Sequence, residues 1–310
     1  MKHLRTLEYI RGVGRSGSIR KAAEQLNITP SALTRKIQDF EHELGTQVFE
    51  RLPHGMRLNA AGELLVRHIQ DQLSDFEQLR SQIADLSGVR RGHVTIACSQ
   101  GFVDHVLPSE IEGYRREFPL VSFAVQVRDH ALGVAALIGY EADLALLLDP
   151  PPAPEMQVLF ATQQPLCALM RSDHPLAGEG PVRLRDCLRH PIAMPDHSLA
   201  IRHRLDAAFA RMQQTPHTII EASSVEFLRN YVLREQIVSF QILLGVPEGL
   251  PRLVVRPIDE RDLGAVQIVL GQMRGRTLPI ASAKFADQLS RSLAALMPPA
   301  ITATRTGSRR

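Results

Sequence analysis

Apolar side chains near the start of the chain recur at helical spacing. The clearest series, with steps of four, three and four, is Leu33, Ile37, Phe40 and Leu44. This spacing predicts a helix with one buried face. Thr29 is a suitable N-cap, and Pro30 suits the first helical position, where its missing N–H costs nothing. We therefore expect a helix from Pro30, preceded by a shorter Ala-rich helix with Ser18 as its N-cap.

The polar face of the second predicted helix contains no acidic residue. Four polar positions at i, i+3, i+4 and i+7 form it: Ser31, Thr34, Arg35 and Gln38. DNA phosphates would repel a carboxylate on such a face, whereas hydroxyl, amide and guanidinium groups donate hydrogen bonds to phosphates and base edges. The pattern predicts a helix-turn-helix whose second helix enters the major groove. A small helical bundle with a solvated polar face is the alternative.

A long helix is predicted over residues 60–88, with Asn59 as its N-cap and Gly88 at its end. Its apolar positions alternate in steps of four and three around Gln72, as in a coiled coil: Leu65, Ile69, Phe76, Leu79 and Ile83. The helix would be roughly 40 Å long and cannot bury such a stripe by itself. We expect these five side chains to form a dimer contact.

From residue 90 the pattern changes to alternating strands and helices. Apolar runs over 92–98, 121–127 and 142–148 predict buried strands with helical segments between them. Such alternation indicates parallel βαβ units. Strand patterns broken at 163–165 predict a crossover into a second α/β set, and a return strand follows at 266–271 before a last helix over 282–296.

Charge is distributed unevenly along the 310 residues. Residues 1–59 hold ten Lys or Arg and six Asp or Glu, a net charge of +4, whereas residues 60–304 hold 23 basic and 27 acidic residues, a net charge of −4. A basic head favours a polyanion partner, although chance alone also produces a difference of this size. No signal-peptide pattern and no apolar run of about 18 residues occurs, so we expect a cytoplasmic protein without a membrane segment.

The reactive residue types point to no catalytic or metal site. Three widely spaced cysteines, Cys98, Cys167 and Cys187, predict core packing rather than a disulfide framework, although Arg185 and Arg189 flank Cys187 and could lower its pKa. The histidines have no metal-ligand spacing, and we expect no cofactor. Common motifs of hydrolases, nucleotide-binding enzymes and zinc proteases do not occur, which argues against an enzyme.

Residues 17–62 resemble the N-terminal domain of LysR-type transcriptional regulators. The match contains Ala22-Ala23, the segments PSAL, RKIQDFEHELG and VFER, and then Gly55 and Leu58. The resemblance implies an α plus α/β protein with a winged helix-turn-helix, a dimerising linker helix and a two-lobed effector domain similar to type 2 periplasmic binding proteins. The expected boundaries are 1–59, 60–89 and 90–300, with lobe I at about 90–162 and 267–300, lobe II at about 163–266, and a disordered tail at 301–310.

The resemblance also implies the DNA contacts and the partners. Ser31, Thr34 and Arg35 match recognition-helix positions, and Arg51 matches a wing residue that reaches the minor groove. The further candidates are Lys36, Gln38 and Arg57. Expected partners are double-stranded promoter DNA, further copies of the chain in a homodimer or homotetramer, and RNA polymerase. Pro30 replaces a Gln that often contacts a base in the family, so the preferred DNA sequence is open.

An unknown small-molecule effector is expected between the two lobes. The candidate effector-binding residues are Ser99, Gln100, Arg128, His197, Ser198, Ser223, Ser224 and Gln241. Ser99 and Gln100 are expected to start a helix whose N–H groups face the cleft, which favours an anion such as a small carboxylate. Residues 234–241 depart from the family pattern, so Gln241 either adds a polar group to the cleft or marks an atypical regulator.

Two further classes of protein stay open. A solute-binding protein suits the α/β half, but the chain has a DNA-binding head and no export signal. An effector-independent DNA-binding protein is supported only by the unusual segment 234–241. A ligand that raises the apparent stability of the folded chain would separate this class from an effector-responsive regulator.

Overall fold

The computed structural model describes residues 2–52, 55–86, 91–247 and 249–296. The chain forms two compact units, Met1–Ile83 and Ala84–Arg310. The end expected for the long helix at Gly88 and the expected tail at 301–310 lie outside the described residues. Within the described part, no helix is both long and apolar enough to cross a membrane.

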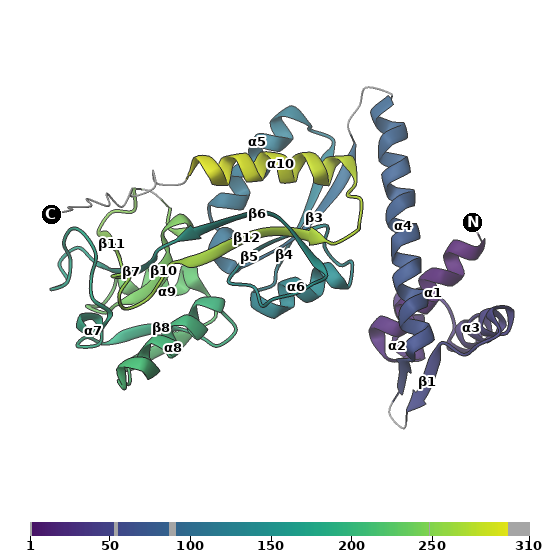
Figure 1. The fold of residues 1–310 in the computed structure, drawn as a ribbon, viewed down its shortest axis with the longest axis horizontal. Helices are drawn as coiled ribbons and strands as arrows, with labels where there is room; N and C mark the ends of the chain where they lie inside the picture. The colour runs from purple at the N-terminus through teal and green to yellow at the C-terminus, as the bar shows by residue number, and fades with distance from the viewer. Residues whose placement is uncertain (1, 53–54, 87–90, 248, 297–310) are drawn as a thin grey trace, which may run out of the picture. The chain divides into compact units, whose positions relative to one another are not determined.

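The first unit contains three helices, a hairpin and most of a long helix (Figure 1). Its elements are α1 (Lys2–Ser16), α2 (Ile19–Gln25), α3 (Pro30–Leu44), β1 (Phe49–Leu52), β2 (Gly55–Leu58) and α4 (Ala60–Leu86). Their apolar side chains form one core that includes Ile10, Val13, Ala23, Leu33 and Ile37. The strands β1 and β2 pair antiparallel, as a wing after a helix-turn-helix does.

Local hydrogen bonds fix the ends of these helices where the sequence predicted them. Ser18 accepts a hydrogen bond from the Lys21 backbone N–H, and Thr29 accepts one from Ala32 N–H at 3.3 Å, directly before Pro30. These contacts confirm both predicted N-caps. Leu44 was expected in the core but is 45% exposed, because α3 ends there.

The first turn of α4 is attached to the wing. The Asn59 side chain accepts a hydrogen bond from Gly62 N–H at 2.8 Å and donates one to the Gln47 carbonyl at 2.8 Å. Asn59 is therefore the predicted N-cap. A Cβ atom at Gly62 would lie 2.0 Å from the Val48 carbonyl oxygen, so only glycine allows this approach.

The predicted apolar stripe of α4 consists of a buried part and an exposed part. Ile69 is fully buried and Leu65 is half-buried in the core of the head. In contrast, Phe76, Leu79 and Ile83 are 46–58% exposed. The expectation that all five residues form a dimer contact is thus wrong for Ile69, whose side chain is covered by its own chain.

The second unit begins with a five-stranded sheet in the order β4-β3-β5-β12-β6. Its strands are β3 (Gly92–Cys98), β4 (Val121–Val127), β5 (Leu144–Leu148), β6 (Met156–Gln164) and β12 (Val266–Met273). The strands β4, β3 and β5 are parallel, as the alternating pattern predicted, and β12 runs antiparallel to β5 and β6. We call this sheet and its helices lobe I.

Helices cover both faces of the lobe I sheet (Figure 1). α5 (Val106–Glu117) and α10 (Ile280–Ala295) pack together on one face, and α6 (His130–Ile138) packs on the other. Alternate strand residues face opposite cores, since Leu144 and Leu146 contact the α5–α10 side whereas Ala145 and Leu147 contact the α6 side. The central strands β3, β5 and β12 are largely buried on both faces, which explains their nearly continuous apolar sequences.

Lobe II contains a three-stranded sheet, β10-β7-β11, and a parallel pair, β8-β9. Its strands are β7 (Leu166–Arg171), β8 (Ile192–Pro195), β9 (Thr218–Ala222), β10 (Ser239–Ile242) and β11 (Leu253–Pro257). Its helices are α7 (Leu184–Cys187), α8 (Ala200–Met212) and α9 (Val225–Val232). A bridge between Ile192 and Val238 joins the two sets of strands.

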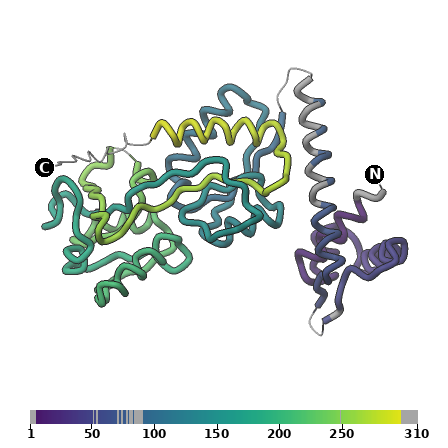
Figure 2. The backbone as a smooth tube through the Cα atoms, in the orientation of Figure 1, coloured from purple at the N-terminus to yellow at the C-terminus, as the bar shows by residue number. Residues whose placement is uncertain are grey.

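Two segments connect the lobes, as the tube in Figure 2 shows. The chain passes from β6 into β7 at Pro165 and returns between β11 and β12. β6 and β12 pair along their full length. The first crossing therefore leaves lobe I beside the strand at which the second crossing returns. The predicted break between two strands is found at Pro165, whereas Gln163 and Gln164 are the last residues of β6.

Candidate DNA-binding face and inter-lobe cleft

The exposed face of α3 carries the polar residues that the sequence singled out. Ser31, Arg35, Lys36 and Gln38 are exposed and Thr34 is half-buried, whereas Leu33 and Ile37 on the opposite side are buried. The first turn of α3 contains no acidic residue. This face therefore presents hydroxyl, amide and cationic groups to solvent over about two turns of helix.

Two of these hydroxyl groups also contact the start of α3. Thr34 Oγ1 donates to the Pro30 carbonyl at 2.8 Å, and the hydroxyls of Ser31 and Thr29 lie 3.4 Å apart. Arg35 and Lys36 form no ion pair with another described residue. Both cations are thus available to an external anion.

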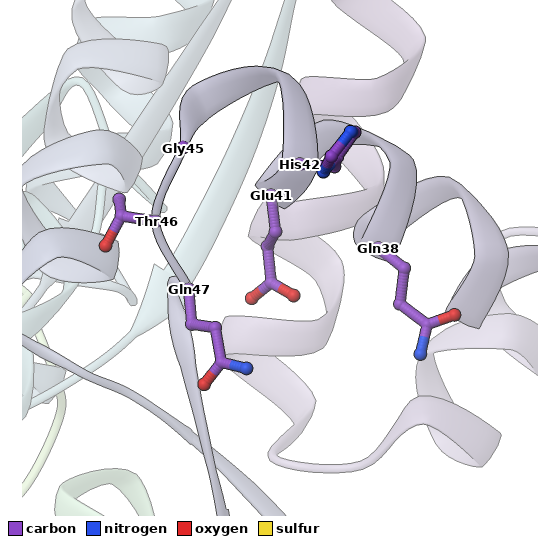
Figure 3. Close-up of a pocket in the computed structure, with 6 residues that line it drawn as sticks. All are labelled: Gln38, Glu41, His42, Gly45, Thr46 and Gln47. Atoms are coloured by element: carbon purple, nitrogen blue, oxygen red, sulfur yellow. The ribbon is translucent and has the colours of Figure 1, made fainter.

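A hollow of about 430 Å³ lies at the end of α3, where the chain turns toward β1 (Figure 3). Gln38, His42 and Gln47 are among its lining residues. Glu41, which also lines it, accepts hydrogen bonds from Val48 N–H at 2.8 Å and Phe49 N–H at 3.3 Å. This carboxylate positions the wing relative to α3, a role that the sequence pattern did not reveal.

The strands of the wing carry two further cationic residues, Arg57 and Arg51. Arg57 on β2 is exposed and pairs with Glu50 on β1 at 2.9 Å. The backbone of Arg51 lies in β1 opposite Met56, and its side chain is outside the described residues. An exposed pair of this kind is weak, so Arg57 can exchange Glu50 for a phosphate at little cost.

Between the two lobes lies a very small cavity of about 10 Å³. Its lining consists of Gly101, Asp129, Leu148, Leu199, Ile201, Val225, Gln241 and Ile242. Only Asp129 and Gln241 contribute polar side chains. A space of this size holds about one water molecule, so the lobes are in close contact around it.

Asp129 joins the lobes at the edge of this cavity. Its Oδ1 accepts hydrogen bonds from Ser99 Oγ at 2.5 Å and from His130 N–H at 2.9 Å, both in lobe I. The backbone N–H of Ala200, the first residue of α8 in lobe II, also favours the charged form of this carboxyl and lowers its pKa. Burial raises the pKa of Asp129 above its ordinary value, although these donors favour the charged form.

Two ion pairs also cross between the lobes. Arg229 on α9 donates to Asp104 at 2.9 Å, and its buried Nη1 has no hydrogen-bond partner among the described residues. Arg204 on α8 donates from Nε to Asp149 at 2.5 Å and from Nη2 to the Ala265 carbonyl at 3.0 Å. These two ion pairs connect the lobes.

Gln241, predicted to add a polar group to the cleft, does line the cavity. It is only 2% exposed on β10. Its Nε2 donates to the Gly245 carbonyl at 2.6 Å, and its Oε1 is buried without a hydrogen-bond partner among the described residues. A buried acceptor oxygen without a donor destabilises the folded protein unless a ligand or water donates a hydrogen bond to it.

The other predicted effector residues do not line this cavity. Ser99 is fully buried and lies behind it, bonded to Asp129 and to Leu148 N–H. The helix expected to start at Ser99 and Gln100 is only a three-residue 3-10 helix, Gln100–Phe102, with Ser99 in its N-cap position, and α5 begins at Val106. The remaining residues are outside the lining, with Arg128, His197, Ser198 and Ser223 exposed and Ser224 acting as the N-cap of α9.

All three cysteines are buried free thiols. Burial raises the pKa of Cys98, Cys167 and Cys187 to about 12. The predicted core packing is confirmed, and the arginines beside Cys187 do not lower its pKa. The described residues include no group of three or more metal-ligating side chains that could hold an ion.

A helix-turn-helix head with a wing and a two-lobed α/β domain define a DNA-binding transcriptional regulator with an effector domain. Two family models match the chain: "Bacterial regulatory helix-turn-helix protein, lysR family" over residues 4–63, and "LysR substrate binding domain" over residues 87–294. The chain belongs to the LysR family of transcriptional regulators.

Individual proteins agree with this assignment. The HTH-type transcriptional regulator CysB of Burkholderia cenocepacia is 26% identical over 279 residues, which cover 88% of this chain and 85% of that protein. Full-length OxyR from Pseudomonas aeruginosa has a TM-score of 0.68 at 19% identity and covers 92% and 94% of the two chains. CbnR in complex with its target DNA has a TM-score of 0.57 at 16% identity, covering 93% and 99%.

Proposed function

We propose that this regulator recognises promoter DNA through the exposed face of α3 and the wing. The acid-free face of α3 carries the proposal, because its cations have no partner among the described residues. The proposed DNA contacts are Ser31, Thr34, Arg35, Lys36, Gln38, Arg51 and Arg57. The structure of the similar protein CbnR with its target DNA supports the proposal.

We further propose that the protein acts as a homodimer or homotetramer in the cytoplasm, together with RNA polymerase, and has no enzymatic activity. The curated relatives are transcriptional regulators. Phe76, Leu79 and Ile83 supply an exposed apolar stripe on α4 that a second copy of the helix would cover. The inter-lobe cleft is the proposed effector site, with Gln241 in its lining.

The domain limits follow from the same proposal. We assign the DNA-binding domain to residues 1–59, the linker helix to 60–89 and the effector domain to 90–300. The contact between Asn59 and the start of α4 supports the first limit. The crossings at Pro165 and between β11 and β12 support division of the effector domain into two lobes.

Fluorescence anisotropy tests the DNA contacts. Purified protein is titrated with the DNA immediately upstream of its gene and with a scrambled duplex, at two salt concentrations. Arg35→Ala is expected to reduce the preference for the upstream DNA, since a base contact is worth about 1–3 kcal/mol, whereas Lys36→Ala is expected to weaken both duplexes alike. Arg115→Ala, on the exposed side of α5, is the matched control. Equal binding by Arg35→Ala and the unmodified protein would contradict the proposal.

A further inference from the structure

The chain's own carboxylate occupies the position in the cleft where an anion would bind. The N–H of Ala200, at the first residue of the 13-residue helix α8, favours the charged form of Asp129 and lowers its pKa. Asp129 also receives the hydroxyl of Ser99 and the N–H of His130. These donors are the groups that favour a bound carboxylate. A carboxylate effector would therefore meet a filled site and a like charge.

The lining of this cavity offers no cation to a carboxylate effector. None of the residues that line the cavity is basic. Outside the lining, Arg204 donates to Asp149 and Arg229 donates from Nη2 to Asp104, while Nη1 of Arg229 is buried without a hydrogen-bond partner among the described residues. Arg128, which follows β4, is exposed and outside the lining. The chemistry of the lining thus disfavours the small carboxylate that the sequence suggested.

The unsatisfied group in the cavity is an acceptor. The Gly245 carbonyl can only accept a hydrogen bond, so the Gln241 atom 2.6 Å away from it must be the donor Nε2. This contact fixes the orientation of the amide and leaves Oε1 as the buried oxygen without a partner. Oε1 and the Asp129 carboxylate belong to residues that line the same cavity.

We propose that the inter-lobe cleft binds its effector through a primary ammonium group that donates to Asp129 and to Gln241 Oε1. An ammonium group has three donors and one positive charge, so it complements a carboxylate and a neutral acceptor. The carbon chain of the effector would contact Leu148, Leu199 and Ile242. The cavity of about 10 Å³ accepts only the head group, so a longer ligand separates the lobes. This inference rests on the proposal that the cleft is the effector site.

Thermal unfolding of the full-length protein tests the ligand class with matched probes. The probes are methylammonium, propylammonium and n-butylammonium chlorides, sodium butyrate, and n-butanol, all at equal ionic strength. Binding to the folded state raises the apparent melting temperature. We expect n-butylammonium to raise it progressively as its concentration increases, and butyrate and butanol to leave it unchanged.

Two variants locate the site of binding. Asp129→Asn keeps the size and the N-cap of α6, and we expect it to bind n-butylammonium at least about tenfold more weakly because the charged acceptor is lost. Gln241→Met removes the second acceptor and should also weaken binding. Glu117→Gln, an exposed carboxylate-to-amide change on α5, should have no effect. Affinities of all variants are measured by titration calorimetry.

Either of two results would overturn the inference. One is a melting temperature that butyrate raises, or that all three ammonium ions leave unchanged. The other is unchanged n-butylammonium affinity in both Asp129→Asn and Gln241→Met. Fluorescence anisotropy with the upstream DNA, measured on the same protein preparation, separates this inference from the proposed DNA-binding function. Sequence-selective DNA binding without ammonium binding removes only this inference, whereas loss of selective DNA binding removes the proposed function.

Discussion

Arg229 in lobe II donates a hydrogen bond from Nη2 to Asp104 Oδ2 in lobe I, at 2.9 Å. The two residues are 125 positions apart in the sequence. The Arg229 side chain is 7% exposed and that of Asp104 is 25% exposed. The pair therefore spans the lobes in a largely dehydrated setting, where breaking it costs more than breaking a surface pair.

The first prediction concerns this ion pair. Arg229→Met should destabilise the protein by about 1–3 kcal/mol, because it leaves Asp104 without its cation. The exposed part of Asp104 keeps the cost in that range, since water replaces some of the lost contact. Urea unfolding measures the change. Arg116→Met, which breaks an exposed pair with Glu112 on α5, should change the free energy of unfolding by under about 0.5 kcal/mol. Equal effects of both variants would show that the inter-lobe pair is no stronger than a surface pair.

The second prediction concerns the pH dependence of stability. The pKa of Asp129 is raised in the folded protein, mainly by burial. Between the unfolded pKa and this raised value the folded state binds more protons, so the stability from this group falls as the pH rises through that window. Asp129→Asn removes the titration. The free energy of unfolding of the unmodified protein minus that of the variant should thus decrease from acidic to neutral pH. A constant or rising difference would contradict the assignment.

The third prediction concerns the junction between the wing and α4. Gly62→Ala places a Cβ atom 2.0 Å from the Val48 carbonyl oxygen and forces this buried contact apart. We expect a loss of at least about 2 kcal/mol in the head, with loss of DNA binding. Gly113→Ala on exposed α5 meets its nearest neighbour at 3.7 Å and should gain up to about 1 kcal/mol. Circular dichroism during unfolding and DNA anisotropy measure both effects. Unchanged stability and DNA binding in Gly62→Ala would contradict the close approach of Gly62 to the Val48 carbonyl oxygen.

The fourth prediction concerns self-association through α4. Phe76→Glu combined with Ile83→Glu places charges on the exposed stripe and should raise the dissociation constant of the dimer at least about tenfold. Leu64→Glu, on an exposed face of the same helix outside the stripe, should leave association unchanged. Sedimentation equilibrium measures both constants. Unchanged association of the double variant would mean that the dimer forms elsewhere.

Local features of the fold were predictable because nearby residues determine them. The N-caps Ser18, Thr29 and Asn59 each bond to backbone within three residues. The predicted strands at 92–98 and 121–127 have the observed ends, since continuous apolar runs between polar turns identify buried strands. The acid-free face of α3 likewise follows from helical spacing alone.

Features that join distant segments were not predictable from spacing. Asp129 had no distinguishing pattern, and its role depends on Ala200 in the other lobe. The heptad spacing of α4 continued through Ile69, but the fold of the head buries that residue, so only Phe76, Leu79 and Ile83 stay exposed. The helix expected to start at Ser99 and Gln100 is limited to a 3-10 helix of three residues. Gly101 and Gly245 approach each other across the cleft, so that a Cβ atom on Gly245 would lie 2.6 Å from the Gly101 carbonyl oxygen. No pattern in the sequence indicated this contact.

The most direct test of the central claim is footprinting on the DNA immediately upstream of the gene. The full-length protein is compared with Arg35→Ala and with the control Arg115→Ala. We predict protection of a long, two-part site by the unmodified protein and the control, and loss of that protection in Arg35→Ala, because Arg35 lies on the exposed face of α3 that we propose to enter the groove. Equal protection by Arg35→Ala would contradict the assignment of α3 as the recognition helix.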